Sequence, residues 1–254
     1  MMLWCKNARI SAMVVAFVVA VAWPAAYALD TNPNIDQEWI GRIDYTRISD
    51  GSYRGEEHWR LTRHPDGSQT IRMTVRLDDT EVLRDVVLRV DGALKPIDSY
   101  QTLWTAGEHR GSGYYWLEGN RLNAVLTGPQ GTLTQSVEVP DQFSFVSHPL
   151  AADGWHFWYY DWDQAGVQSA TVYNTDTLGL TVGSILARVH ETPVEFLGNE
   201  VIDVPAGTFS TWRFLMDGRL EIWVDREHFF MVRMTNTSRD RLYELGYLAP
   251  AYSE

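Results

Sequence analysis

The sequence predicts an all-β protein whose single antiparallel sheet is curled or forms an open barrel. Three observations favour this fold class. Hydrophobic residues recur at every second position in short segments, Gly, Pro, Asn and Asp separate these segments, and no stretch after residue 28 keeps a helical period for three turns. Turn signals about 8 to 12 residues apart are typical of sandwiches and barrels. Residues 141–166 are the least strand-like and are expected to form an irregular, aromatic-rich segment. If the mature chain contains a helix, we expect it in this segment.

The N-terminus has the features of a secretory signal peptide, which would be cleaved after Ala28. Lys6 and Arg9 supply positive charge, and residues 10–21 form an apolar run. This run is too short to cross a bilayer comfortably, because a spanning helix needs about 20 residues. A retained N-terminal anchor is the alternative interpretation. We expect residues 29–254 to be a single β domain, periplasmic or secreted, with no stable membrane span after cleavage.

Composition limits how the mature chain is stabilised and which partners suit it. The only cysteine, Cys5, precedes the cleavage point, so the mature chain can form no disulfide and depends on its hydrophobic core. Without Lys6 and Arg9, 19 of the 21 basic residues remain against 33 acidic ones, which gives a net charge of −14. This balance argues against nucleic acid or an anionic membrane surface as the main partner. The sequence indicates no particular protein partner.

The hairpin around Pro65 illustrates the strand pattern. Hydrophobic residues alternate with polar ones over residues 71–77, and residues 53–61 precede them. Pro65, Asp66 and Gly67 form the turn between them, because proline fixes one φ and glycine tolerates a positive one. The same pattern predicts further strands over residues 82–90, 96–104, 114–117, 122–126, 132–139, 194–204, 208–216, 220–224 and 229–235.

A sheet of this many strands has exposed edges unless it curls or closes. A curled sheet of this size encloses a cavity or packs its concave face around another group. The architecture therefore favours ligand binding, although it names no ligand.

The sequence carries no strong catalytic or metal-binding signature. It has no Gly-x-Ser-x-Gly elbow, no His-Glu-x-x-His motif and no phosphate-binding glycine loop. The seven histidines, at positions 58, 64, 109, 148, 156, 190 and 228, are not spaced to share one metal ion within an element. We therefore interpret them as surface residues and expect no metal and no cofactor. The alternative is a metal site formed by residues from strands that are distant in the sequence.

The most unusual segment is residues 155–163, where six of the first eight residues are aromatic. Aromatic faces suit flat or apolar ligands, and nearby polar groups can orient them. The candidate ligand-binding residues are Trp155, Trp158, Tyr159 and Trp162. The polar groups beside them are His156, Asp161 and Asp163. The alternative interpretation is a plug that fills the barrel mouth with its own rings.

Glu57 is a further candidate. Alternation along residues 53–61 places it on the same strand face as Trp59 and Leu61, where an unpaired carboxylate costs free energy. We interpret Glu57 as exposed at a sheet edge. Pairing with an arginine across the sheet, exposure to a polar cavity, and an acid–base role through a raised pKa are the alternatives.

Several segments resemble a family of exported bacterial proteins that are known as domains of unknown function. The segments are residues 204–209, 221–225, 241–245 and 87–100, and they consist of turns and strand edges. The barrels of this family are similar to periplasmic lipoprotein carriers. The resemblance implies a curled antiparallel sheet that holds or passes on an apolar molecule. It implies no catalytic residues.

The sequence is compatible with three functions. The first is a periplasmic binding or carrier protein for a hydrophobic or lipid-like small molecule. The second is a hydrolase, hydratase or isomerase that uses carboxylates in the same cavity, with Glu57, Asp161 and Asp163 as acid–base groups and His156 as a partner. The third is a structural or assembly factor of the cell envelope, in which an exposed aromatic patch binds another protein.

Overall fold

The computed structural model describes residues 37–129, 131–146, 149–175 and 187–251. The expected signal peptide and His148 lie outside the described residues. The described strands form one sheet of 15 strands, in the order β8-β7-β6-β5-β4-β3-β2-β1-β15-β14-β13-β12-β11-β10-β9. Their bounds are β1 Gln37–Thr46, β2 Tyr53–Arg63, β3 Gln69–Leu77, β4 Val82–Val90, β5 Pro96–Thr105, β6 Glu108–Glu118, β7 Arg121–Gly128, β8 Gly131–Glu138, β9 Ser144–Val146, β10 Val167–Thr175, β11 Ala187–Val204, β12 Gly207–Met216, β13 Leu220–Asp225, β14 Met231–Asn236 and β15 Arg241–Pro250.

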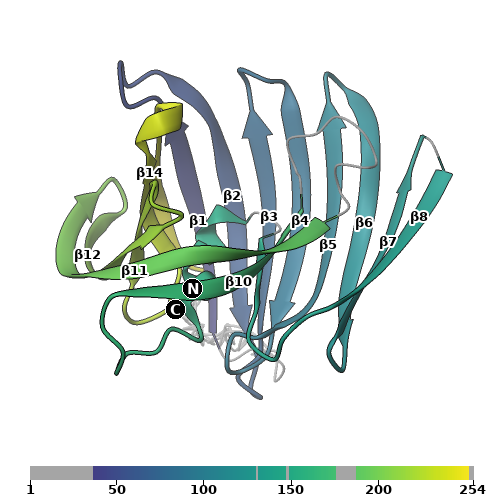
Figure 1. The fold of residues 1–254 in the computed structure, drawn as a ribbon. Coiled ribbons are helices and arrows are strands. Elements are labelled where there is room, and N and C mark those ends of the chain that lie inside the picture. The colour runs from purple at the N-terminus through teal and green to yellow at the C-terminus, as the bar shows by residue number, and fades with distance from the viewer. Residues whose placement is uncertain (1–36, 130, 147–148, 176–186, 252–254) are drawn as a thin grey trace, which may run out of the picture. The chain divides into compact units, whose positions relative to one another are not determined.

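The sheet is curled but not closed. Each strand pairs with its neighbour in the chain, except that β1 pairs with β15 and β8 does not pair with β9. In Figure 1, β10 and β11 pass in front of β1 to β5, so the two halves of the sheet face each other. The predicted all-β fold with one curled sheet is therefore confirmed. One pairing departs from the expected antiparallel pattern, because the short strand β9 runs parallel to β10.

The predicted hairpin is formed by β2 and β3. Arg63 pairs with Gln69, and the intervening turn contains Gly67 at φ 83°. The Asp66 carboxylate accepts the backbone N–H of Ser68 at 2.9 Å, which is a turn contact typical of Asp. Local sequence therefore determines both the position of this turn and the register of the strands.

Four strands, β1, β9, β10 and β15, fall outside the predicted segments, and β6 and β11 are longer than expected. Their hydrophobic alternation is weaker, since β10 is mainly polar and β1 carries glycine in its middle. The glycine of β1, Gly41, leaves room for the Trp59 ring of β2, because a Cβ at Gly41 would lie 2.2 Å from that ring. Pairing with neighbouring strands, rather than local alternation, holds these segments in the sheet.

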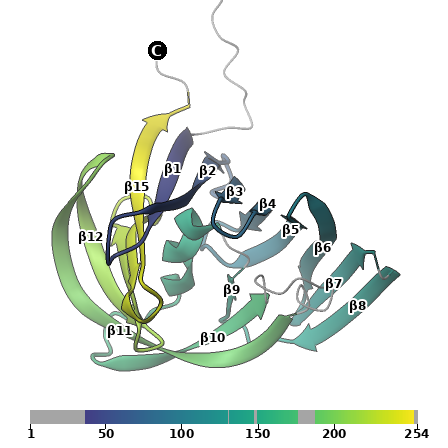
Figure 2. The same cartoon turned by 90° about the horizontal axis from the view of Figure 1, so that it is seen from above.

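A short 3₁₀ helix, η1 (Leu150–Phe157), lies inside the curl of the sheet and is the teal coil enclosed by strands in Figure 2. It falls within the segment predicted to be irregular. All eight of its residues are buried, and it contacts β9, β13 and β14. The core thus includes both the inner face of the sheet and this internal helix. The helix fills part of the interior, and a cavity remains beside it.

Candidate functional site

A cavity of about 630 Å³ lies between η1 and one end of the curled sheet. Its wall includes the first residues of β2, β4, β13 and β15 and the last residues of β3, β12 and β14. In an antiparallel sheet each strand begins beside the end of its neighbour. These positions therefore come together at one end of the curled sheet. The volume lies within the range of roughly 300–1,000 Å³ that is usual for small-molecule sites.

The deeper wall of the cavity is apolar. Val75 of β3, Met216 of β12, Ile222 of β13 and Met234 of β14 line it and are buried. Methionine side chains adapt their shape to irregular apolar ligands. The wall therefore presents an apolar surface that water solvates poorly and that an apolar group can cover.

The floor of the cavity is η1, which contributes Leu150, Asp153 and His156. The Glu57 carboxylate of β2 fastens the start of this helix. It accepts the backbone N–H of Leu150 at 2.9 Å and that of Ala151 at 3.0 Å. The hydroxyl of Tyr45 donates to the same carboxylate at 3.0 Å. Glu57 therefore satisfies N–H groups at the helix start that have no partner within the helix.

Glu57 is fully buried, so the interpretation of this residue as an exposed edge carboxylate is wrong. Burial raises the pKa of Glu57 to about 7, and its hydrogen bonds oppose that rise. The guanidinium of Arg84, on β4, is also buried, and burial lowers its pKa to about 10 while Tyr45 and Glu57 oppose the shift. Glu57 therefore lies near a buried arginine on another strand, which resembles the alternative in which it pairs with an arginine across the sheet.

His156 is buried, so the interpretation of the histidines as surface residues is wrong for this one. It is held between two side chains beneath the cavity. Its Nε2 lies 3.2 Å from Oδ1 of Asp153, and its Nδ1 is hydrogen-bonded to the hydroxyl of Ser144 on β9. Serine, histidine and aspartate thus form a chain, which is the set used in nucleophilic catalysis. Ser144 is buried and is not among the described residues that line the cavity. The chain therefore ties η1 to β9 without presenting the serine hydroxyl to a ligand.

The aromatic side chains of residues 155–163 do not line this cavity, although His156 of the same segment does. Trp155 is buried in the core, and Phe157 stacks on Phe214 of β12 with ring centroids 4.0 Å apart. Nε1 of Trp158 donates to the carbonyl of Phe143 at 3.1 Å, and the hydroxyl of Tyr159 donates to a backbone carbonyl of β10 at 3.1 Å. The first part of the segment thus packs into the interior, as the plug interpretation describes.

The last part of the segment lies at the surface. Trp162 is 48% exposed and packs against Trp212 and Phe196, and Asp161 and Asp163 are exposed. Asp161 and Tyr159 line a separate groove of about 800 Å³ beside β10, and His156 borders both hollows. Neither Glu57 nor these two aspartates line the cavity, so the expectation that the three carboxylates share it is wrong. Alternation and composition cannot reveal on which side of the sheet an irregular segment emerges.

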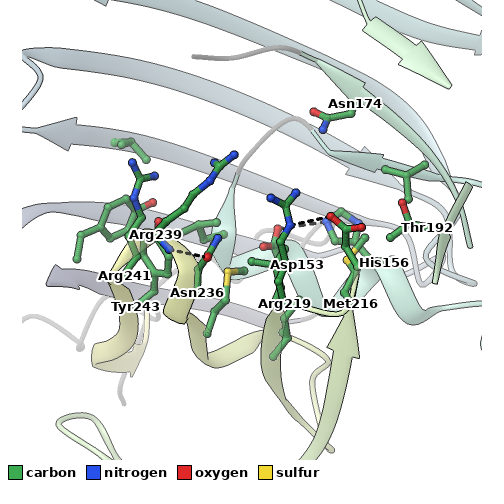
Figure 3. A pocket seen from close by; sticks show the side chains of 18 of the residues that line it. Asp153, His156, Asn174, Thr192, Met216, Arg219, Asn236, Arg239, Arg241 and Tyr243 are labelled. Carbon is green, nitrogen blue, oxygen red and sulfur yellow. Dashed lines mark hydrogen bonds and ion pairs between the residues drawn. The ribbon is translucent and has the colours of Figure 1, made fainter. Parts of the chain in front are cut away.

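The cavity also contains a group of basic residues that inspection of the sequence missed. The five arginines that line it are Arg54, Arg84, Arg219, Arg239 and Arg241. In Figure 3, Arg219, Arg239 and Arg241 extend their guanidinium groups in the same direction. These three lie in or beside turns, and only the strand order shows that the turns meet at one end. The sequence signal that could have found them is the placement of arginine next to a predicted turn.

Within the described ranges, no group of three or more His, Cys, Asp or Glu side chains could hold a metal ion. The same part of the chain contains no helix that is both long and apolar enough to traverse a bilayer.

No family model and no curated protein matches the chain. A similar solved structure is the crystal structure of a β-barrel-like protein of domain of unknown function DUF1849 from Brucella abortus. The two chains share a fold. The match has a TM-score of 0.56 at 14% sequence identity and covers 85% of this chain and 99% of that chain. The expected resemblance to a barrel of unknown function is confirmed at the level of fold, while export and similarity to lipoprotein carriers remain predictions.

Proposed function

We propose that this protein binds a hydrophobic, lipid-like small molecule in the cavity above η1 and acts as a periplasmic binding or carrier protein. The apolar cavity wall carries this proposal. Val75, Ile222 and Met234 form a surface that is enclosed by the curled sheet and reachable from one end. Apolar ligands gain most of their affinity from covering such surface. The N-terminus, which has the features of a signal peptide, supports the proposal that the protein is exported to the periplasm.

The arrangement of polar groups favours binding over catalysis. Glu57 uses its carboxylate to hold the start of η1, and Ser144 does not border the cavity. Asp161 and Asp163 are exposed, whereas Glu57 is fully buried. A general acid or base must reach the proton that it transfers, and these candidates do not meet around one space.

The proposal is tested with N-phenyl-1-naphthylamine, a neutral fluorophore whose emission rises in apolar surroundings. Leu220 lines the cavity at its mouth and is half-buried, so Leu220→Trp places a bulky ring in the opening. The matched control is Leu83→Trp, because Leu83 is 39% exposed on β4 and does not line the cavity. Both variants should keep the wild-type melting temperature within a few degrees.

We expect the wild type and Leu83→Trp to bind the fluorophore with equal affinity, and Leu220→Trp to bind it about tenfold more weakly, a loss of about 1.4 kcal/mol. Equal binding by Leu220→Trp and Leu83→Trp would place the fluorophore elsewhere and contradict the proposal. Absence of binding by all three proteins would contradict it as well.

A further inference from the structure

The cavity has the opposite charge to the protein as a whole. The complete chain carries 33 acidic and 21 basic residues, a net charge of −12. The lining of the cavity contains five arginines against two aspartates, Asp153 and Asp217, an excess of three positive charges with histidine neutral. A local surplus of one sign inside a hollow concentrates the field there and attracts ligands of the other sign. The cavity therefore favours an anionic ligand.

The inner arginines are occupied by protein carboxylates or lie close to one. Nε of Arg54 lies 2.8 Å from Oδ2 of Asp79, and the Arg54 side chain is buried. Arg84 is buried within the electrostatic reach of Glu57. At the mouth, Nε of Arg219 lies 2.7 Å from Oδ2 of Asp217. These three arginines shape the field of the cavity, but each has protein charge nearby.

The two remaining arginines, Arg239 and Arg241, have no carboxylate partner among the described residues. The nearest acid in the chain, Asp240, is itself occupied, since its carboxylate accepts the backbone N–H and the hydroxyl of Ser49 at 2.8 and 2.7 Å. Arg239 is exposed and Arg241 half-buried, and both line the cavity from η3 (Thr237–Arg239) and the start of β15. Their guanidinium groups can therefore donate hydrogen bonds to an external anion.

The apolar and basic parts of the lining occupy different depths. Val75, Ile222 and Met234 lie on the buried wall, whereas Arg239 and Arg241 stand at the strand ends where the cavity opens. An arginine fork forms paired hydrogen bonds with the oxygens of a carboxylate or phosphate. A ligand that satisfies both regions has an apolar tail and an anionic head.

We infer that the cavity selects a single-chain amphiphile with a carboxylate or phosphate head, whose tail enters towards η1 and whose head pairs with Arg239 and Arg241. This inference rests on the proposed function and specifies the class of its ligand. Fatty acids and alkyl phosphates share this chemistry, and the test below separates them.

The test measures displacement of N-phenyl-1-naphthylamine from the protein by four compounds with the same tail: dodecanoate, dodecyl phosphate, dodecanol and dodecyltrimethylammonium. We expect both anions to displace the fluorophore at concentrations about tenfold lower than dodecanol, and the cation to be the weakest competitor. The anion that displaces the fluorophore at the lower concentration identifies the preferred head group. Raising the salt concentration should narrow the gap between the anions and dodecanol, because salt screens exposed charges.

The double variant Arg239→Gln with Arg241→Gln should abolish the preference for the anions and leave dodecanol unchanged. Its matched control is Arg72→Gln with Arg121→Gln, which removes two exposed arginines that do not line the cavity. If the wild type binds dodecanol with the same affinity as the anions, the inference is overturned. It is also overturned if the double variant Arg239→Gln with Arg241→Gln keeps the preference for the anions. If the fluorophore and all four compounds fail to bind, the proposed function itself is overturned, which is a distinguishable result.

Discussion

The carboxylate of Glu57 accepts the backbone N–H of Leu150 at 2.9 Å, across 93 positions of the chain. This hydrogen bond joins the sheet, near its middle strands, to the internal helix that forms the floor of the cavity. With the bond from Ala151, it explains why a carboxylate is kept in a fully buried position. Glu57 is therefore one of the contacts that position the floor of the cavity.

Replacing Glu57 by alanine should destabilise the protein by about 3 kcal/mol. The change leaves the N–H groups of Leu150 and Ala151 and the hydroxyl of Tyr45 without their acceptor, and each buried unpaired group costs about 1–3 kcal/mol. Urea denaturation measures the loss. The control is Glu56→Ala, which removes a carboxylate from the outer face of the same strand. A similar small loss for both variants would show that Glu57 does not hold η1.

The stability of the protein should depend on pH through Glu57. Burial raises the folded-state pKa of Glu57 from 4.5 to about 7, so the folded state binds more protons than the unfolded state between these values. The free energy of unfolding should therefore fall as the pH rises from about 4.5 to 7, by an amount on the order of 3 kcal/mol. Glu57→Gln removes the titrating group, so its denaturation midpoint should change less over this range. Parallel pH profiles of wild type and variant would refute the prediction.

Gly154 allows η1 to pack against the turn between β13 and β14. A Cβ at this position would lie 2.0 Å from the carbonyl oxygen of Phe229 and 2.7 Å from a methyl carbon of Val224. Gly154→Ala should therefore displace the helix and cost about 1–3 kcal/mol, as overpacked core positions do. Gly92→Ala is the control, since its nearest neighbour would be 3.5 Å away. Thermal melting of both variants checks the difference, and equal melting temperatures would argue against close packing at Gly154.

The two ends of the aromatic segment should respond differently to truncation. Phe157 is 1% exposed and stacks on Phe214, so Phe157→Ala should cost about 3–5 kcal/mol. Trp162 is 48% exposed, so Trp162→Ala should cost about 1 kcal/mol. Chemical denaturation of the two variants measures both values. A loss at Trp162 as large as that at Phe157 would mean that the outer part of the segment belongs to the core.

Local patterns in the sequence predict the curled sheet well. The hairpin at Gly67 is encoded by residues within one turn, and alternation correctly places Glu57 on the same face as Trp59. Such features depend on neighbours in the chain and on the two-residue period of a strand. The weakly alternating strands β1 and β10 are missed, because their pairing is determined by strands already in place.

The candidate site was harder to predict because its parts are distant in the chain. The Glu57 carboxylate accepts the backbone N–H of Ala151, which lies 94 positions later in the chain. Hydrophobic alternation along one strand cannot predict that such a distant contact buries Glu57. Arg54 and Arg241 meet at one cavity only because the strand order brings the start of β2 and the start of β15 to the same end. The aromatic composition of residues 155–163 predicts a ligand-binding segment, but the first half of this segment mainly fills the interior.

Native mass spectrometry of the protein purified from a periplasm, followed by organic extraction, tests the central claim most directly. We expect a discrete additional mass on the wild type that extracts as an acidic lipid. Leu220→Trp, which obstructs the mouth of the cavity, should carry much less of this mass than Leu83→Trp. A wild type that shows only the mass of its own chain, even after incubation with a total lipid extract, would contradict a lipid-binding cavity.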